Sequence, residues 1–160
     1  MYGEPDNHWV STLRSTTGKR LWRSIECNLR YSLRSGLRIN GDTCINGVLY
    51  YGAYVGRSCM IVCFDFSSEK FMSIKLHEGI PHGILINYKG NLGVLVKDGH
   101  QIVLWVLDED AGNHIWCKTI SAPLRNYLYF VGWTTGAGEI VLSPHRGTNP
   151  FYIVYYQGRP

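Results

Sequence analysis

The chain lacks long hydrophobic runs and is poor in charged residues. Its longest uninterrupted apolar segment, Ile102–Leu107, has six residues, whereas a membrane-spanning helix needs about 20. Charged residues make up only 18% of the 160 residues and hydrophobic residues 45%, which excludes a disordered chain. The first eight residues are polar and partly acidic, unlike a secretory signal. We therefore expect no membrane partner and an intracellular protein, either cytoplasmic or nuclear.

Paired cysteines and glycosylation sequons are also absent. The chain has five cysteines, an odd number, and no Cys-x-x-Cys pair. Zinc sites usually present thiolates in close pairs, and disulfide scaffolds usually contain an even number of cysteines. We therefore expect small buried thiols in a reducing compartment. The five positions are Cys27, Cys44, Cys59, Cys63 and Cys117.

The net positive charge comes from the N-terminal quarter. Residues 1–40 hold seven basic and three acidic side chains, whereas the remainder holds nine of each. A basic stretch can contact nucleic-acid phosphates, and the four-residue spacing of Arg30, Arg34 and Arg38 would align them on a helix. Serine and glycine interrupt this segment, however, and Tyr31 is the one aromatic residue between these arginines. A solvated basic face is the favoured interpretation, and nucleic-acid binding is the less favoured alternative.

Aromatic residues and glycine are abundant, and their arrangement predicts β-structure. The chain has 11 Tyr, 5 Trp, 5 Phe and 18 Gly, and glycine separates short apolar runs at intervals of about eight to twelve residues, as in all-β sandwiches, barrels and propellers. Lys89-Gly90 and Lys97–Gly99 are hairpin signals, because glycine accepts a positive φ. Residues 108–113 form a predicted acidic loop, and no long amphipathic helix is visible. The predicted strands are His8–Arg14, Leu21–Cys27, Thr43–Ala53, Met60–Asp65, Lys70–Lys75, Gly83–Tyr88, Asn91–Lys97, Ile102–Leu107, His114–Ile120, Tyr127–Gly132, Glu139–Ser143 and Phe151–Tyr156.

An internal repeat organises these strands. The Gly47–Tyr50 segment returns at Gly90–Gly93, 43 residues later, and Ile61–Phe64 returns at Ile102–Trp105, 41 residues later. A fainter third copy begins at Gly138. Four-stranded units with this period are typical of propeller blades, and at about 45 residues per blade the chain supplies about three and a half. We therefore predict an all-β fold, a partial, about three-blade, kelch-like β-propeller of stacked antiparallel sheets, with exposed strand edges.

A set of motifs in fixed order carries a family resemblance. They are the Trp-Arg-x-Ile strand at Leu21–Ile25, the Ile-Asn-Gly-Val-Leu-Tyr segment within Asp42–Tyr51, the Phe-Asp-Phe-Ser-Ser-Glu-Lys-Phe segment within Ile61–Phe71, Leu85–Leu92, Leu104–Asp108 and Trp116–Lys118. In this order the set resembles the F-box-associated (type 3) β-propeller domain of plant F-box proteins. The match is best over residues 9–123, and residues 1–160 are interpreted as one such domain. We expect the aromatic residues of these motifs to pack in the core, and Asp65 and Ser67 to bond backbone amides in a turn.

The resemblance also implies a function. In this family an N-terminal F-box docks on the Skp-type adaptor of a cullin-RING ubiquitin ligase, and the propeller captures the target protein. No Leu-Pro-led, leucine-rich F-box precedes Trp9. The resemblance therefore implies a non-catalytic protein-interaction domain that binds an unknown target through loops at one end, with an indirect link to a ligase. The other alternative is a truncated paralogue without a separate function, which would self-associate through its unpaired edges.

No pattern indicates an enzyme. His77 and His82 flank a predicted turn, and His114 and Cys117 lie on a predicted strand where successive side chains point to opposite faces. A Cys-His nucleophile also needs a third, orienting group, which spacing does not reveal. The acidic residues 108–110 lack the alternation and glycine of a calcium loop. We therefore assign no catalytic, cofactor-binding or metal-binding residue and expect no cofactor.

Overall fold

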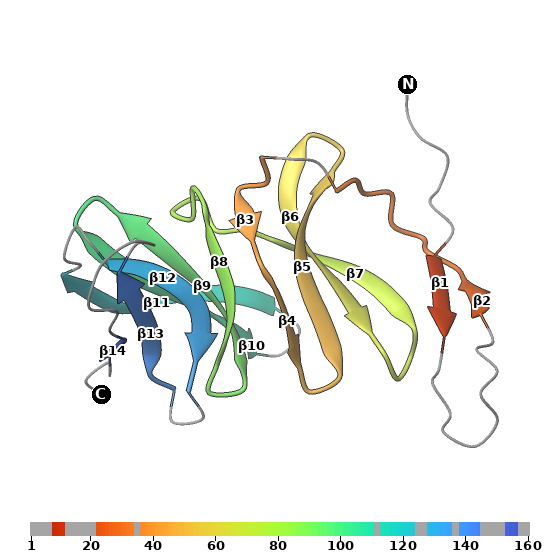
Figure 1. The fold of residues 1–160 in the computed structure, drawn as a ribbon. Helices are drawn as coiled ribbons and strands as arrows, with labels where there is room; N and C mark the ends of the chain where they lie inside the picture. The colour runs from red at the N-terminus through yellow and green to blue at the C-terminus, as the bar shows by residue number, and fades with distance from the viewer. Residues whose placement is uncertain are drawn as a thin grey trace, which may run out of the picture.

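The fold is a row of stacked β-sheets (Figure 1). The computed structural model describes residues 8–11, 22–33, 36–110, 113–123, 128–135, 138–144 and 153–156. In these residues there are fourteen strands and no helix; accordingly, no helix among them could span a membrane. The strands are β1 (His8–Ser11), β2 (Trp22–Ile25), β3 (Ile39–Asn40), β4 (Asp42–Ile45), β5 (Val48–Val55), β6 (Ser58–Asp65), β7 (Lys70–Lys75), β8 (Gly83–Tyr88), β9 (Asn91–Asp98), β10 (Gln101–Asp110), β11 (Asn113–Pro123), β12 (Leu128–Thr134), β13 (Ile140–Pro144) and β14 (Val154–Tyr156).

Four sheets follow one another along the row in chain order. They are β1-β2, β4-β5-β6-β7, β8-β9-β10-β11 with β3 added beside β8, and β12-β13-β14. Neighbouring strands pair antiparallel except β3 and β8, which pair in parallel. This arrangement is an all-β, partial β-propeller without a closed barrel, so the predicted fold class is confirmed.

The sheets β4–β7 and β8–β11 are copies of one unit. Their first hairpins turn at Asn46-Gly47, with φ of 49° and 80°, and at Lys89-Gly90, with φ of 53° and 86°. Two consecutive positive φ values are characteristic of the type I′ turn, whose twist matches that of the flanking strands. The next hairpins turn after Val55 and Asp98, and the three positions lie 43 residues apart in every case.

The strand register refines the repeat that the sequence suggested. Leu49 pairs with Phe64, and Val94 pairs with Trp105. Both hairpins therefore share one shift of 43 residues, and Phe64 corresponds to Leu107. The 41-residue match that aligned Phe64 with Trp105 was wrong by two positions, an error that the strand period of two conceals because both positions lie on the same face.

Two predicted segments need correction. The single strand expected at Thr43–Ala53 is two strands, β4 and β5, because Asn46-Gly47 makes a hairpin turn inside it. The acidic loop expected over residues 108–113 begins too early, since Asp108 pairs with Ile115 and Asp110 with Asn113 at the end of the β10–β11 ladder.

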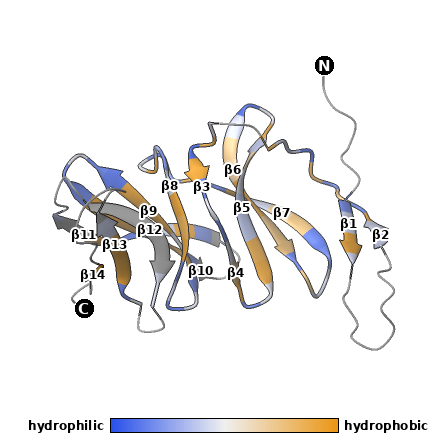
Figure 2. Ribbon diagram, viewed as in Figure 1, coloured by the Kyte–Doolittle hydropathy of each residue, from blue (hydrophilic) through white to orange (hydrophobic). Residues whose placement is uncertain are grey.

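Two hydrophobic cores fill the spaces between consecutive sheets. The first lies between β4–β7 and β8–β11 and includes Tyr50 and Ile61 from one side and Leu92 and Val94 from the other. The second lies between β8–β11 and β12–β14 and includes Leu104 and Ile140. The middle sheet is therefore buried on both faces, which accounts for the nearly continuous apolar sequence of its strands. The turns at the strand ends are mostly hydrophilic (Figure 2).

The motif aromatics are mostly packed, with one exception. Trp105 and Trp116 are partly buried against the first core, and the Trp116 indole donates to the Lys75 carbonyl at 2.9 Å. Phe64 is buried and Phe71 is half-buried, but Phe66 is 52% exposed. The expectation that Phe66 packs in the core was therefore wrong, because it lies just beyond β6, in the turn before β7.

A carboxylate organises the turn between β6 and β7. The Asp65 carboxylate accepts hydrogen bonds from the Ser67 hydroxyl at 2.7 Å, the Ser67 amide at 2.8 Å and the Ser68 hydroxyl at 2.9 Å. The predicted amide bond of Asp65 is confirmed, whereas the Ser67 side chain donates to Asp65 instead of bonding an amide. These bonds, led by that of the Ser67 hydroxyl, lower the pKa of Asp65 to about 2.

The Asp65→Asn variant tests this turn through its pH dependence. Because the folded-state pKa lies below the unfolded value of about 3.9, the carboxylate stabilises the fold above about pH 4 and loses this contribution as the pH falls toward 2. We expect wild type to be more stable than Asp65→Asn in urea at pH 6, and the difference to shrink steadily in titrations down to pH 2. A difference that is the same at both pH values would contradict this role.

Candidate functional site

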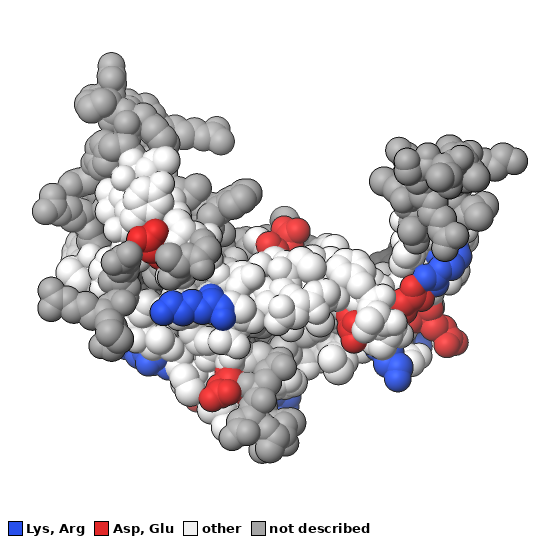
Figure 3. All heavy atoms as spheres, turned by 90° about the horizontal axis from the view of Figure 1, so that it is seen from below, with Lys and Arg blue, Asp and Glu red and all other residues white. Residues whose placement is uncertain are grey.

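The best-formed concavity is a cleft between β1 and the outer face of the β4–β7 sheet. Its volume is about 710 Å³. We call it the outer cleft, and its described lining comes from β1, the segment from Ile25 to Asp42, and strands β5 to β7 with the following turn residue Phe66. Seen from below, the surface between the first hairpin and the last sheet carries few charged side chains (Figure 3).

Apolar side chains on one face of β4–β7 form the floor of the outer cleft. Leu49, Phe64 and Phe71 are neighbours across β5, β6 and β7. The rings of Phe64 and Phe71 have centroids 4.6 Å apart, and the Phe66 ring meets Phe64 edge-on at 5.2 Å. Aromatic pairs of this kind combine a large apolar area with a fixed geometry.

A chain of polar side chains ties β1 to this floor. The Tyr51 hydroxyl donates to the Tyr31 hydroxyl at 2.6 Å, and the Tyr31 hydroxyl shares a 2.6 Å hydrogen bond with His8 Nε2. The His8 ring also lies 4.6 Å from the Phe71 ring. Burial and, secondarily, the Tyr31 hydroxyl raise the pKa of Tyr51. Tyr51 therefore keeps its proton and stays a donor at physiological pH.

A second polar contact joins the first hairpin to the turn after β6. The Arg23 guanidinium forms a two-pronged ion pair with the Glu69 carboxylate. The hydrogen bond between them raises the pKa of Arg23 and lowers the pKa of Glu69. Because the pair is exposed, solvent screens it, and its main effect is to orient the hairpin rather than to stabilise it strongly.

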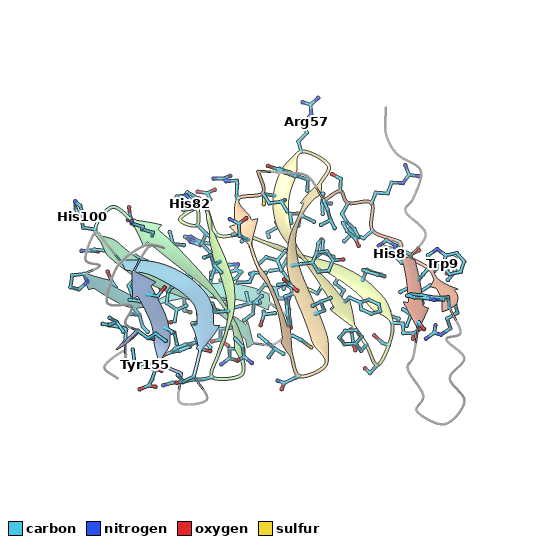
Figure 4. All side chains as sticks on the ribbon, viewed as in Figure 1. His8, Trp9, Arg57, His82, His100 and Tyr155 are labelled. Carbon is cyan, nitrogen blue, oxygen red and sulfur yellow. The ribbon has the colours of Figure 1, made fainter. Side chains whose placement is uncertain are left out.

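The rim of the outer cleft exposes large apolar side chains. Trp9 is 55% exposed and Leu33 66%, and both line the cleft together with Phe66. Figure 4 shows His8 and Trp9 on the first hairpin, apart from the body of the sheets. In the same region His8 Nδ1 and Ser11 Oγ are buried without a hydrogen-bond partner among the described residues.

The loops at one end, which the sequence predicted as the binding surface, form a separate feature. Arg57, His82 and His100 lie together at the upper end of the sheets (Figure 4). Arg57 and His100 occupy equivalent turn positions, 43 residues apart. This rim is convex and exposed, so it lacks the concave shape of the outer cleft.

The remaining candidate residues are scattered. His77 stacks on Trp105 with ring centroids 4.5 Å apart, and both His114 and Cys117 are exposed on β11. Among the described residues, no group of three or more His, Cys, Asp or Glu side chains could hold a metal ion. Cys63 is buried and Cys27 and Cys59 are half-buried, but Cys44 and Cys117 are exposed, so the prediction of buried thiols was wrong for these two.

The basic segment does not form the helix considered from the sequence. Arg30 and Arg38 lie in described residues without helix, and Arg34 lies outside the described residues. Arg38 donates to the Pro81 carbonyl at 2.5 Å, and Arg23 is paired with Glu69. Phosphate binding by this segment stays the less favoured alternative.

The family model for the F-box associated beta propeller domain matches residues 2–159. The chain belongs to this family. The resemblance drawn from residues 9–123 is thereby confirmed, and the match covers nearly the whole chain. No solved structure matches the chain.

Similar proteins from Arabidopsis thaliana carry matching names. The putative F-box protein At1g46840 is 43% identical over 88% of this chain and 29% of its own length. F-box protein At1g53790 is 40% identical over 94% of this chain and 36% of its own length, and F-box protein DOR is 39% identical over 93% and 40%. The chain therefore spans less than half the length of these relatives.

Proposed function

We propose that this chain is a non-catalytic protein-recognition domain that captures a target protein in the outer cleft. The observation that carries the proposal is the open apolar cleft itself, in a domain whose relatives are F-box proteins. Exposed Trp, Tyr and Phe side chains around a concave site are typical of the residues that dominate binding energy in protein interfaces. Trp9, Leu33 and Phe66 would supply such anchors.

In this proposal the chain performs target recognition alone. The 160 residues bind a target inside the cell, in the cytoplasm or nucleus, without binding a Skp-type adaptor directly. Any link to a cullin-RING ubiquitin ligase is then indirect, through another protein.

A pull-down with matched variants tests the proposal. Phe66→Ser removes an exposed ring from the outer cleft, and Ile115→Ser removes a side chain of almost equal exposure, 51% against 52%, from β11. With the tagged chain in plant cell extract, we expect one set of retained proteins to fall at least fivefold with Phe66→Ser and to persist with Ile115→Ser.

The same assay with purified adaptor provides the control. We expect no retention of a Skp-type adaptor by the chain. Stable direct retention of the adaptor, or an identical set of proteins for wild type and Phe66→Ser, would contradict the proposed function.

A further inference from the structure

The first sheet of the row has fewer strands than its neighbours. In the described residues it consists of β1 and β2, whereas β4–β7 supplies four strands to the next sheet and β8–β11 supplies four to the one after. Because β4–β7 and β8–β11 repeat one unit, their strand order shows which part of the first sheet is present.

The pair β1–β2 corresponds to the outer half of that unit. β2 is the last strand before the chain crosses to the next sheet, as are β7 before β8 and β11 before β12. β1 therefore corresponds to β6 and β10. Both of those strands pair on two sides, with β5 and β7 and with β9 and β11, whereas β1 pairs with β2 alone among the described residues.

The floor of the outer cleft corresponds to a face that is covered elsewhere in the molecule. A shift of 43 residues relates Leu49, Tyr51 and Phe64 to Leu92, Val94 and Leu107. These three side chains are buried in the first core, where the preceding sheet covers them. By this equivalence, the position next to β1 and above Leu49 is the place of two further strands.

The edge of β1 also lacks partners on the side of the outer cleft. All four residues of β1 line the cleft, but only Ile25 of β2 does. Two polar atoms of β1, His8 Nδ1 and Ser11 Oγ, are buried there without a partner among the described residues. Buried polar atoms without a hydrogen bond are costly, and a neighbouring strand brings backbone donors and acceptors to such positions.

We propose that the outer cleft is an acceptor for an extended segment of the target protein. The segment adds as a strand along the open edge of β1 and places alternate apolar side chains on Leu49, Phe64 and Phe71. This proposal rests on the proposed function and specifies what the target presents. It uses the β-augmentation mode, in which backbone hydrogen bonds provide affinity and pockets for alternate side chains provide specificity.

The occupant is a segment of another protein rather than a second copy of the chain. Every strand of the described residues already belongs to a sheet. A second copy could therefore donate a described strand only by losing its own pairing, whereas an unfolded segment of a target gives up no sheet.

A synthetic peptide from the repeat itself is the probe. Residues 42–55 form the β4–β5 hairpin, which corresponds to the strands missing beside β1. In the native stack its residues Val48 and Tyr50 pack on the β8–β11 sheet, so they can pack on the equivalent floor of the outer cleft. The peptide carries Cys44→Ser to prevent oxidation. A control peptide adds Leu49→Pro and Gly52→Pro, which removes one backbone donor from each edge of the strand.

Titration calorimetry and hydrogen exchange with the full chain measure the binding. We expect Leu33→Ser and Phe66→Ser to weaken the peptide at least tenfold, Ile115→Ser to change it less than twofold, and the proline peptide not to bind. Saturating peptide should slow amide exchange at least tenfold in β1 and leave β14 unchanged. Absence of binding, equal binding of the proline peptide, or protection outside β1 would overturn the acceptor.

Two further results separate this proposal from its alternatives. A dimer in sedimentation experiments that the peptide dissociates would assign the cleft to a second copy and overturn it. Excess peptide should also displace the proteins captured from extract. Capture that persists beside bound peptide would overturn the acceptor and leave the proposed function intact, whereas peptide binding without any capture would contradict the proposed function alone.

Discussion

Truncation of Leu104 to alanine should lower the free energy of unfolding by about 3 kcal/mol. Leu104 is 0% exposed on β10, which pairs with β9 and β11 in the middle of the stack. Its Cδ1 lies 3.1 Å from the place where a Cβ on Gly93 would stand, so the side chain fills the space left by that glycine. The neighbouring sheet holds Ile140 and Leu142 in the same core and cannot collapse into the cavity without moving as a whole.

Leu49→Ala is the matched control, because the same truncation is made on the floor of the outer cleft. Leu49 is half-buried and lines an open space that water can enter. We expect a loss of about 1 kcal/mol, near the centre of the distribution for single substitutions. Urea denaturation followed by circular dichroism measures both variants. Equal losses would mean that the floor of the cleft is packed like the core, which would contradict an open acceptor.

The repeat made much of the fold predictable. The strands Lys70–Lys75 and Gly83–Tyr88 have the predicted bounds, because charged or turn residues delimit each apolar run. The failures have local and non-local causes. The merged strand Thr43–Ala53 shows that an Asn-Gly turn outweighs a long run of β-forming residues. β3, with two residues and a parallel partner 44 positions along the chain, has no local pattern that could reveal it.

The outer cleft was not predictable in the same way. Trp9, Leu33, Leu49 and Phe66 come from separate segments, and each resembles a core residue in its local sequence. Their exposure follows from the two-stranded first sheet, which a count of strands preceding the first repeat unit could have indicated. The alternation of apolar residues predicts that a face is covered, but it does not say whether the cover belongs to the same chain.

Replacement of Gly52 by valine should be about as damaging as the loss of Leu104, at about 3 kcal/mol, for the opposite reason. A Cβ at this position of β5 would lie 2.5 Å from the Ile39 carbonyl oxygen and 3.1 Å from the Ile39 Cβ. The nearest atom belongs to the backbone of β3, which is held in place by pairing with β8, so no side-chain rotation can relieve the overlap.

The consequence of Gly52→Val extends to the outer cleft. β3 ends the segment that carries Tyr31 and Leu33 over the β4–β7 sheet, and Tyr31 holds His8 of β1. Displacing β3 should therefore weaken the strand peptide at least tenfold as well as lower the urea midpoint. Thr43→Val places the same side chain on the adjacent strand β4, where a side chain of similar size already fits, and should change stability by less than about 0.5 kcal/mol. If Gly52→Val kept wild-type stability and peptide binding, β3 would not lie against β5 as described, and the segment from Tyr31 to Ile39 would not form one wall of the cleft.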